Sequence, residues 1–186
     1  MSAPMSRLRD AHQAFSGLLS GMGRVVIAGG AVRDALMWHN DPKDYDVFVL
    51  GQSVDAQTLK QMADLVTPHF DGVPPALEFH TSEPFLACSV MWNGTMVQVL
   101  ASEFTTEDEL IDSFDWHVSR FSFDGERVTT PEDIATIGRN KPLLLRKVTF
   151  PLSTLRRGFR FSERFGMEFR HEDVMALCRQ VVESKS

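Results

Sequence analysis

The chain of 186 residues has the length of one ordinary domain, and its 43% hydrophobic residues and formal net charge of −6 are typical of a globular protein. No apolar run approaches the roughly 20 residues of a membrane span, and the N-terminus lacks the apolar segment of a signal peptide. Cys88 and Cys178 have no CxxC or zinc-ligand spacing, so we expect reduced thiols in a cytoplasmic protein. These properties argue against a secreted, membrane or fibrous protein.

The first third of the chain alternates between helical and strand patterns. Its predicted elements are, in chain order, helix 5–20, strand 24–28, helix 31–38, strand 44–50 and helix 54–67. Gly21 and Gly23 end the first helix, and Gly29 and Gly30 separate the first strand from the second helix. This alternation indicates an α/β protein.

The middle of the chain is rich in predicted strands, and the C-terminal third is rich in predicted helices. The predicted elements are strands 77–80, 86–92 and 95–100, helix 107–113, a hairpin of 116–123 with 126–130, an extended piece at 143–149, and helices 151–165 and 172–183. Asn93 and Gly94 tolerate the positive φ of a type I′ turn, so they predict a tight hairpin. This order of elements predicts an α/β (α+β) fold with a mixed central sheet and flanking helices.

Segment 25–50 carries the most informative functional pattern. Gly29 and Gly30 follow a buried strand and precede a helix, and glycines let a ligand approach the main chain closely. The free N–H groups and the positive dipole end of that helix point toward the turn, with Arg33 and Asp34 in its first turns. This arrangement favours a phosphate-bearing ligand.

Two carboxylates follow this turn in the sequence. Asp44 and Asp46 enter the strand 44–50, and alternate residues of a strand project from the same face. Their charges repel each other unless a cation lies between them, and hard oxygen ligands suit Mg²⁺. A D-x-D pair or a Gly-Gly pair alone is usually just part of a solvated turn, but the two in this order predict a site for a triphosphate and magnesium.

A basic segment near the C-terminus gives a second indication. Nine Lys or Arg residues and two acids give residues 139–170 a local net charge of +7 in an otherwise acidic chain. The basic residues are Arg139, Lys141, Arg146, Lys147, Arg156, Arg157, Arg160, Arg164 and Arg170. Total charge argues against nonspecific duplex binding, whereas a basic face of this density suits a phosphate-bearing partner. A solvated helix face remains the alternative interpretation.

Residues 29–34 (GGAVRD) followed by 43–46 (KDYD) resemble the signature of class II tRNA nucleotidyltransferases and bacterial poly(A) polymerases, which belong to the DNA polymerase β-like superfamily. Residues 115–119 (DWHVS) resemble a diverged form of the family's RRDFTIN segment, and 155–161 (LRRGFRF) resemble its LRAxRF helix. The resemblance implies a nucleotidyltransferase head over 1–149 and a short helical neck over 150–186. A chain this short is similar to minimal, phage-type members.

The same resemblance implies an activity and a set of site residues. Asp44 and Asp46 would be the catalytic residues and would hold two Mg²⁺ ions. The nucleotide-binding residues that it implies are Gly29, Gly30, Arg33, Asp34, Asp115, Arg157 and Arg160. The implied reaction transfers NMP from an NTP to an acceptor hydroxyl, at the 3′ end of an RNA or tRNA, and releases pyrophosphate.

Three departures from the family pattern bear on this expectation. Ser113 and Phe114 replace two arginines that precede the ribose-contacting acid, and Gln98 stands where many superfamily members place a third acid. Residues 150–154 (FPLST) replace the EDxxR motif with which CCA-adding enzymes read cytosine and adenine. Without those hydrogen-bonding groups, ordered selection of C and then A is expected to fail.

These departures leave two alternatives open. A catalytically diverged protein would bind nucleotide, RNA or a partner protein through the basic 139–170 face, and a third kind of protein would transfer NMP to a protein hydroxyl. The intact Asp44 and Asp46 pair favours an enzyme, because a binding protein gains nothing from two adjacent anions. We therefore expect NTP and RNA as partners, with the RNA held by the basic 139–170 face.

Overall fold

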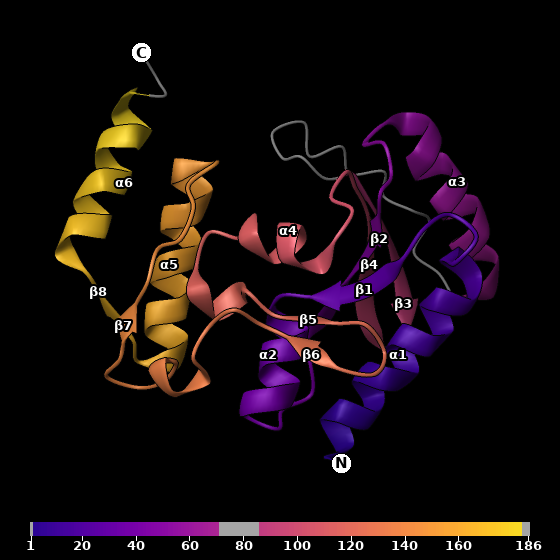
Figure 1. Cartoon of the computed structure of the whole chain (residues 1–186), viewed down its shortest axis with the longest axis horizontal. Coiled ribbons are helices and arrows are strands. Elements are labelled where there is room, and N and C mark those ends of the chain that lie inside the picture. The colour runs from indigo at the N-terminus through magenta and orange to yellow at the C-terminus, as the bar shows by residue number, and fades with distance from the viewer. Residues whose placement is uncertain (1, 71–85, 184–186) are drawn as a thin grey trace. The chain divides into compact units, whose positions relative to one another are not determined.

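The computed structural model describes residues 2–70 and 86–183, and the chain divides into two compact units (Figure 1). The first unit comprises Met1–Ile111 and Phe121–Thr130, and the second comprises Asp112–Arg120 and Pro131–Ser186. The predicted neck, 150–186, lies within the second unit, which also takes two stretches of the predicted head, 1–149. The predicted strand 77–80 lies outside the described residues.

The first unit is built around a mixed six-stranded sheet of order β3-β4-β2-β1-β5-β6. Its elements are α1 (Ala3–Leu19), β1 (Val25–Ala28), α2 (Gly30–Met37), β2 (Asp44–Leu50), α3 (Ala56–Val66), η1 (Thr67–His69), β3 (Leu86–Trp92), β4 (Thr95–Ser102), α4 (Glu107–Asp112), β5 (Ser122–Phe123) and β6 (Val128–Thr129). β2 pairs with β4 in parallel, and the other neighbouring strands are antiparallel. The predicted mixed sheet with flanking helices is confirmed.

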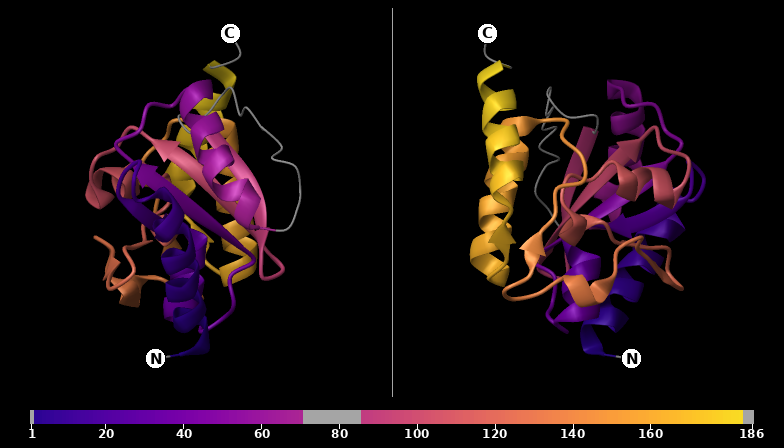
Figure 2. Two further views of the ribbon diagram at one scale, coloured as in Figure 1. Left: turned by 90° about the vertical axis from the view of Figure 1, so that its right-hand side faces the viewer. Right: turned by 60° about the vertical axis from the view of Figure 1, so that its left-hand side comes forward.

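One face of this sheet is covered by helices and forms the core. Ile27, Val47 and Phe123 share that face because they lie opposite one another in β1, β2 and β5. His12 of α1 contacts the Phe123 ring edge-on at 6.0 Å, which places α1 on the same face. Both views of Figure 2 show α3 on the same side of the sheet as α1. Asp46, which alternates with Val47, therefore projects from the opposite face.

The second unit packs around the indole of Trp116. Its elements are η2 (His117–Ser119), η3 (Ile134–Thr136), β7 (Pro142–Leu143), α5 (Pro151–Phe165), β8 (Glu168–Phe169) and α6 (His171–Glu183). Trp116 is fully buried, donates from Nε1 to the main-chain oxygen of Thr154 at 2.9 Å, and contacts the Phe169 ring edge-on.

No helix among residues 2–70 and 86–183 combines the length and apolar character needed to cross a membrane.

Two predicted extended segments are shorter in the structure than expected. The predicted strand 116–123 begins instead with the short helix η2, and only Ser122 and Phe123 form β5. His117 lies in η2, where its Nδ1 accepts a hydrogen bond from Leu144 N–H at 3.1 Å. The side chain therefore helps to hold the local fold. The predicted extended piece 143–149 contributes only Leu143 to β7 and Leu145 to an isolated bridge with Trp116.

Gly158 shows how closely α5 packs on this core. A Cβ atom there would lie 2.6 Å from Trp116 Cζ2 and 2.8 Å from Phe169 Cε1. We expect Gly158→Ala to lower the free energy of unfolding by about 1–3 kcal/mol, because both rings are held by their neighbours and must move. Gly17→Ala in α1 is the matched control, since nothing lies within 4 Å of its Cβ position and alanine favours the helix. Chemical denaturation of both variants checks this; equal stability for both would contradict it.

Candidate functional site

The two carboxylates of the predicted site leave one face of β2 at its first residues. Asp44 is exposed and Asp46 is half-buried, while Tyr45 between them is buried on the other face. Asp46 lies opposite Ala28, the last residue of β1, in the antiparallel pair. The acidic pair therefore lies beside the end of β1, where the chain turns into α2.

The turn at Gly29 brings the main chain close to Asp46. Gly29 has φ +81°, and a Cβ atom there would lie 3.7 Å from Asp46 Oδ2. The Gly29 N–H donates to Phe121 O at 2.8 Å, which fixes the turn, and α2 begins at the next residue, Gly30. The first turn of a helix carries free N–H groups and positive potential. The turn thus places the start of a helix, with its positive potential, beside a carboxylate.

The surroundings of Asp46 disfavour the ionised form of its carboxyl group. Burial and, to a smaller extent, the negative charge of Asp44 raise the pKa of the Asp46 carboxyl to about 7. Neither carboxylate makes a hydrogen bond or ion pair with another residue among 2–70 and 86–183. An added cation would relieve both effects.

The donor set fits a magnesium ion that shares its ligands with a phosphate. Asp44 and Asp46 supply hard carboxylate oxygens, and Mg²⁺ in proteins commonly takes one or two carboxylates together with substrate phosphates and water. The described part of the chain holds no group of three or more His, Cys, Asp or Glu side chains suited to a metal. The remaining ligands would therefore come from a bound nucleotide and from water.

The raised pKa of Asp46 gives a stability test that needs no substrate. In chelator, the stability that neutral Asp46 contributes is present below its ordinary pKa near 4 and is lost as the pH rises through about 7. Asp46→Asn should then stabilise the metal-free protein by about 2–4 kcal/mol at pH 8 and change little at pH 4. Denaturation at both pH values measures this. Mg²⁺ should stabilise only the wild type, and an equal response of both proteins would contradict the assignment.

Arg33 and Asp34 form a buried ion pair within α2. Both side chains are almost fully buried, and Arg33 Nη2 lies 2.8 Å from Asp34 Oδ1. The guanidinium also lies 5.5 Å from the centre of the Trp38 ring and would be 3.3 Å from a Cβ at Gly30. The guanidinium thus lies at the start of α2, next to the predicted triphosphate-binding turn, and Asp34 neutralises it there.

A row of mostly polar residues crosses the sheet at the level of Asp46. Ser89, Gln98, Asp46 and Ser122, with the apolar Ala28 between the last two, lie opposite one another across neighbouring strands. Gln98 stands directly beside Asp46, in the position considered for a third acid. Sequence reasoning missed Ser89 and Ser122, although the two-residue turn at Asn93 and Gly94 fixes the pairing of Ser89 with Gln98.

The other predicted site residues belong to the second unit. Arg157 donates from Nε to Asp115 Oδ2 at 2.7 Å, and Trp116 N–H donates to Asp115 Oδ1 at 2.9 Å. The structure therefore brings Asp115 and Arg157 together as an ion pair. Arg160, one turn later on α5, is exposed and makes no ion pair with a described residue. These three residues and the Asp44–Asp46 pair lie in different units.

The start of α5 offers little polar chemistry where a base-reading motif would stand. Phe150 precedes the helix and Pro151 is its first residue. Thr154 is fully buried, and its Oγ1 has no hydrogen-bond partner among the described residues. No side chain of this segment presents a paired donor and acceptor.

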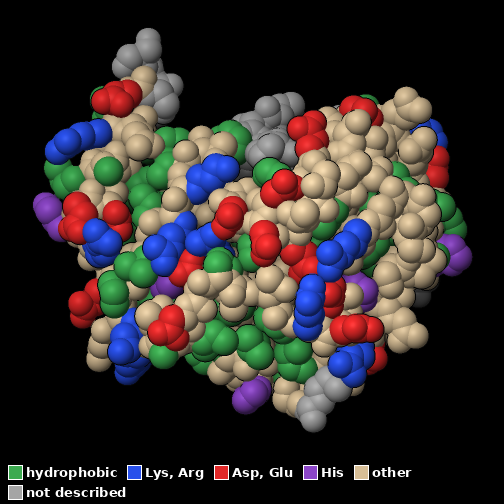
Figure 3. Space-filling model, viewed as in Figure 1, with side chains coloured by type: hydrophobic (Ala, Val, Ile, Leu, Met, Phe, Trp, Pro, Cys, Tyr) green, Lys and Arg blue, Asp and Glu red, His purple; other side chains and the backbone are tan. Residues whose placement is uncertain are grey.

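The basic 139–170 face is partly neutralised by ion pairs. Arg146 contacts Glu132 at 2.6 Å, and Arg170 contacts Glu172 at 2.5 Å, in addition to the pairing of Arg157 with Asp115. Figure 3 shows Lys and Arg side chains interspersed with Asp and Glu over the visible surface. The positive charge that this face can offer a partner is therefore smaller than the +7 counted from the sequence, and it is confined to the basic residues outside these ion pairs.

The comparisons with known proteins locate the fold. No protein-family model and no curated protein matches the chain. A Thermotoga maritima CCA-adding enzyme complexed with tRNA matches with a TM-score of 0.62 and 16% identity over 99% of this chain and 43% of that one. A CCA-adding enzyme with ATP matches with a TM-score of 0.61 and 19% identity over 97% of this chain and 43% of that one.

A tRNA-processing enzyme in an apo form gives a similar result, with a TM-score of 0.62 and 16% identity over 95% of this chain and 47% of that one. The chain thus spans less than half the length of these structures. It shares its fold with the matched parts of these CCA-adding and tRNA-processing enzyme structures, and the expected fold class is confirmed.

Proposed function

We propose that the chain is a metal-dependent nucleotidyltransferase that transfers NMP from an NTP to the 3′ hydroxyl of an RNA. The observation that carries this proposal is the half-buried Asp46 beside Asp44, with a pKa raised to about 7 and the Gly29 turn next to it. A carboxylate pair in this state gains most from a cation that brings phosphate oxygens with it. The fold shared with CCA-adding enzymes supports the same reaction class.

The chain's own residues would bind and orient the nucleotide. Asp44 and Asp46 would hold Mg²⁺, which when bound would stabilise negative charge on the attacking and leaving oxygens. Gly29, which has no side chain, would let the phosphates approach the turn, and the main-chain N–H of Gly30 in the first turn of α2 would donate to the triphosphate. The Arg33 guanidinium would lie alongside, with Asp34 holding it in place.

In the reaction, the acceptor hydroxyl oxygen forms a new bond to the α-phosphorus of the NTP. The bond from that phosphorus to the bridging oxygen of the β-phosphate breaks, and pyrophosphate leaves with the bonding electron pair. The hydroxyl proton goes to solvent. What this chain supplies is the alignment of the triphosphate and a half-buried setting in which charge stabilisation is strong.

The family resemblance assigns roles to three residues of the second unit. Asp115 would accept a hydrogen bond from the ribose, Arg157 would hold that carboxylate in place, and Arg160 would face the nucleotide. The RNA would contact exposed residues of the basic 139–170 face that are not consumed by ion pairs. A tRNA is the first acceptor to test, because one of the matching structures is a complex with tRNA.

The direct experiment is incubation of the protein with each α-labelled NTP, Mg²⁺ and total RNA, followed by separation of labelled RNA from labelled protein. Label in RNA that appears only with Mg²⁺ supports the proposal. Label in protein alone would replace the RNA acceptor with a protein hydroxyl. Absence of label in both would contradict an active transferase.

A diverged binding protein is the second candidate, favoured by the neutralised Arg33 and by Gln98 beside Asp46. Such a protein would bind an NTP with Mg²⁺ but release it unchanged. Calorimetric titration with a non-hydrolysable NTP analogue, set beside the labelling assay, separates the two candidates. Binding without any labelling would favour the diverged protein.

A further inference from the structure

Helix α5 presents an aromatic ring on its outer surface. Phe159 is 54% exposed, although the other large aromatic residues of the helix, Phe161 and Phe165, stack on each other at 6.0 Å and are less exposed. The Phe159 ring also contacts Phe169 of β8 edge-on at 5.0 Å. It is thus held in position by the second unit while much of its surface stays open.

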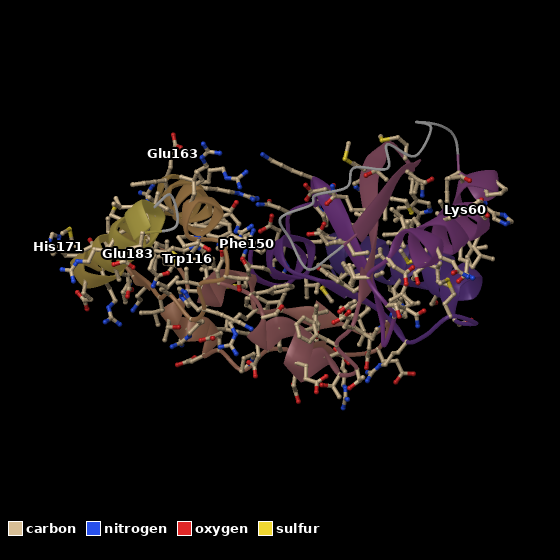
Figure 4. All side chains as sticks on the ribbon, turned by 90° about the horizontal axis from the view of Figure 1, so that it is seen from above. Lys60, Trp116, Phe150, Glu163, His171 and Glu183 are labelled. Carbon is tan, nitrogen blue, oxygen red and sulfur yellow. The ribbon has the colours of Figure 1, made fainter. Side chains whose placement is uncertain are left out.

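This ring lies on the side of α5 that does not face the core. Thr154 and Gly158, one turn apart, are buried and lie against Trp116. Figure 4 shows Glu163 pointing away from α5 on the side opposite Trp116. Phe159 and Glu163 are four residues apart and so are neighbours on the helix surface.

Positive charge lies beside the ring. Arg156 precedes Phe159 by three residues and so is its neighbour on the helix surface. Arg156 is exposed and makes no ion pair with a described residue. The helix carries four arginines and one acid, Glu163. A half-exposed ring that is held by Phe169, with an unpaired arginine one turn away, offers a flat apolar surface next to a positive charge.

We propose that Phe159 and Arg156 form a binding site for single-stranded RNA, in which a base stacks on the Phe159 ring and the adjacent phosphate contacts Arg156. Aromatic rings stack on every base, and a neighbouring cation that follows the backbone completes such a site. A duplex does not fit, since its bases are already stacked inside the helix. This inference deepens the proposed function, and rests on it, by assigning the surface that holds the acceptor strand.

The test uses the full chain and a fluorescent 12-nucleotide oligouridylate, with binding followed by anisotropy in chelator and without NTP. Phe159→Leu keeps the apolar bulk against Phe169 but removes the ring, and should weaken binding about 5- to 100-fold. Phe159→Trp should retain or strengthen binding. Arg156→Ala should lower the slope of log affinity against log salt by about 0.7.

Glu163→Gln is a variant that is expected to raise the RNA affinity instead of lowering it. Removing the acid beside the ring should raise affinity by about two- to threefold, because less negative charge then faces the phosphates. The matched controls are Leu65→Ala and Arg9→Ala, an apolar and a basic exposed residue of the first unit, and neither should change binding. A DNA strand of the same sequence shows whether the ribose hydroxyl contributes.

Because this assay contains neither metal nor NTP, it is independent of catalysis. Loss of RNA binding in Phe159→Leu with unchanged thermal unfolding supports the site even if no transfer is ever detected. Equal binding of wild type and Phe159→Leu would overturn it, as would tighter binding of duplex than of single strand. Capture of a protein through this surface, with no RNA binding, would also overturn it.

Discussion

Asp44→Asn or Asp46→Asn is expected to lower nucleotidyl transfer by at least about 10³-fold while the protein stays folded. Each substitution removes one of the two carboxylates that would hold the metal, and metal-supplied charge stabilisation contributes several kcal/mol to such reactions. For Asp46 the folded state should not suffer, since a neutral amide avoids the burial and repulsion that raise the carboxyl pKa to about 7. Initial rates with labelled NTP measure the effect.

The matched control for this prediction is Asp41→Asn. Asp41 precedes β2 by three residues and is exposed in an ion pair with Arg7 at 2.5 Å, so it has the same charge without a place in the site. Its activity should remain within about twofold of wild type, as expected for an exposed pair. Manganese binding followed by electron paramagnetic resonance adds a readout independent of turnover. Full activity in the double variant Asp44→Asn, Asp46→Asn would overturn the assignment.

Local patterns predicted the geometry of those parts of the candidate site that lie on single elements. The alternation along β2 places Asp44 and Asp46 on one face, and the Gly29 and Gly30 pair marks the strand-to-helix turn. The Asn93 and Gly94 turn, which has positive φ at both residues, set the register of β3 with β4. In each case a short stretch of chain determines its own geometry.

Contacts between distant segments were not predictable from those patterns. Glu132 forms ion pairs with Arg120 and Arg146 in the second unit, and no spacing of residues in the sequence predicts that cluster. The burial of Arg33 likewise depends on tertiary packing around α2, so an arginine expected to bind triphosphate was found also to pair with Asp34. The hydrophobic pattern of residues 116–119 could not distinguish the short helix η2 from a strand. His117 and its neighbours Trp116 and Val118 are all buried within the second unit, so no exposed face marks the helix.

Nucleotide choice is the second place where a large effect is expected. Hydrogen-bonding sites discriminate by 10⁴–10⁵, whereas pockets that rely on shape and stacking reach about 10². Phe150 and Pro151 have no polar side-chain group, and Thr154 is fully buried with its carbonyl bound to the Trp116 indole. We therefore expect the four NTPs to be used within about 10²-fold of one another, with no ordered addition of C, C and A.

A tRNA that lacks its terminal CCA, supplied with all four NTPs and then sequenced at its 3′ ends, measures this directly. Mixed additions are the expected result, and ordered CCA ends would contradict it. Such ends would require reading groups elsewhere, and Asp115 with Arg157 is one described pair that offers a carboxylate acceptor and a guanidinium donor together. Arg157→Lys would decide the matter, because lysine keeps the charge but loses the planar donor geometry that base reading needs. Order that survives in Arg157→Lys would exclude the pair, and order lost in that variant would identify it.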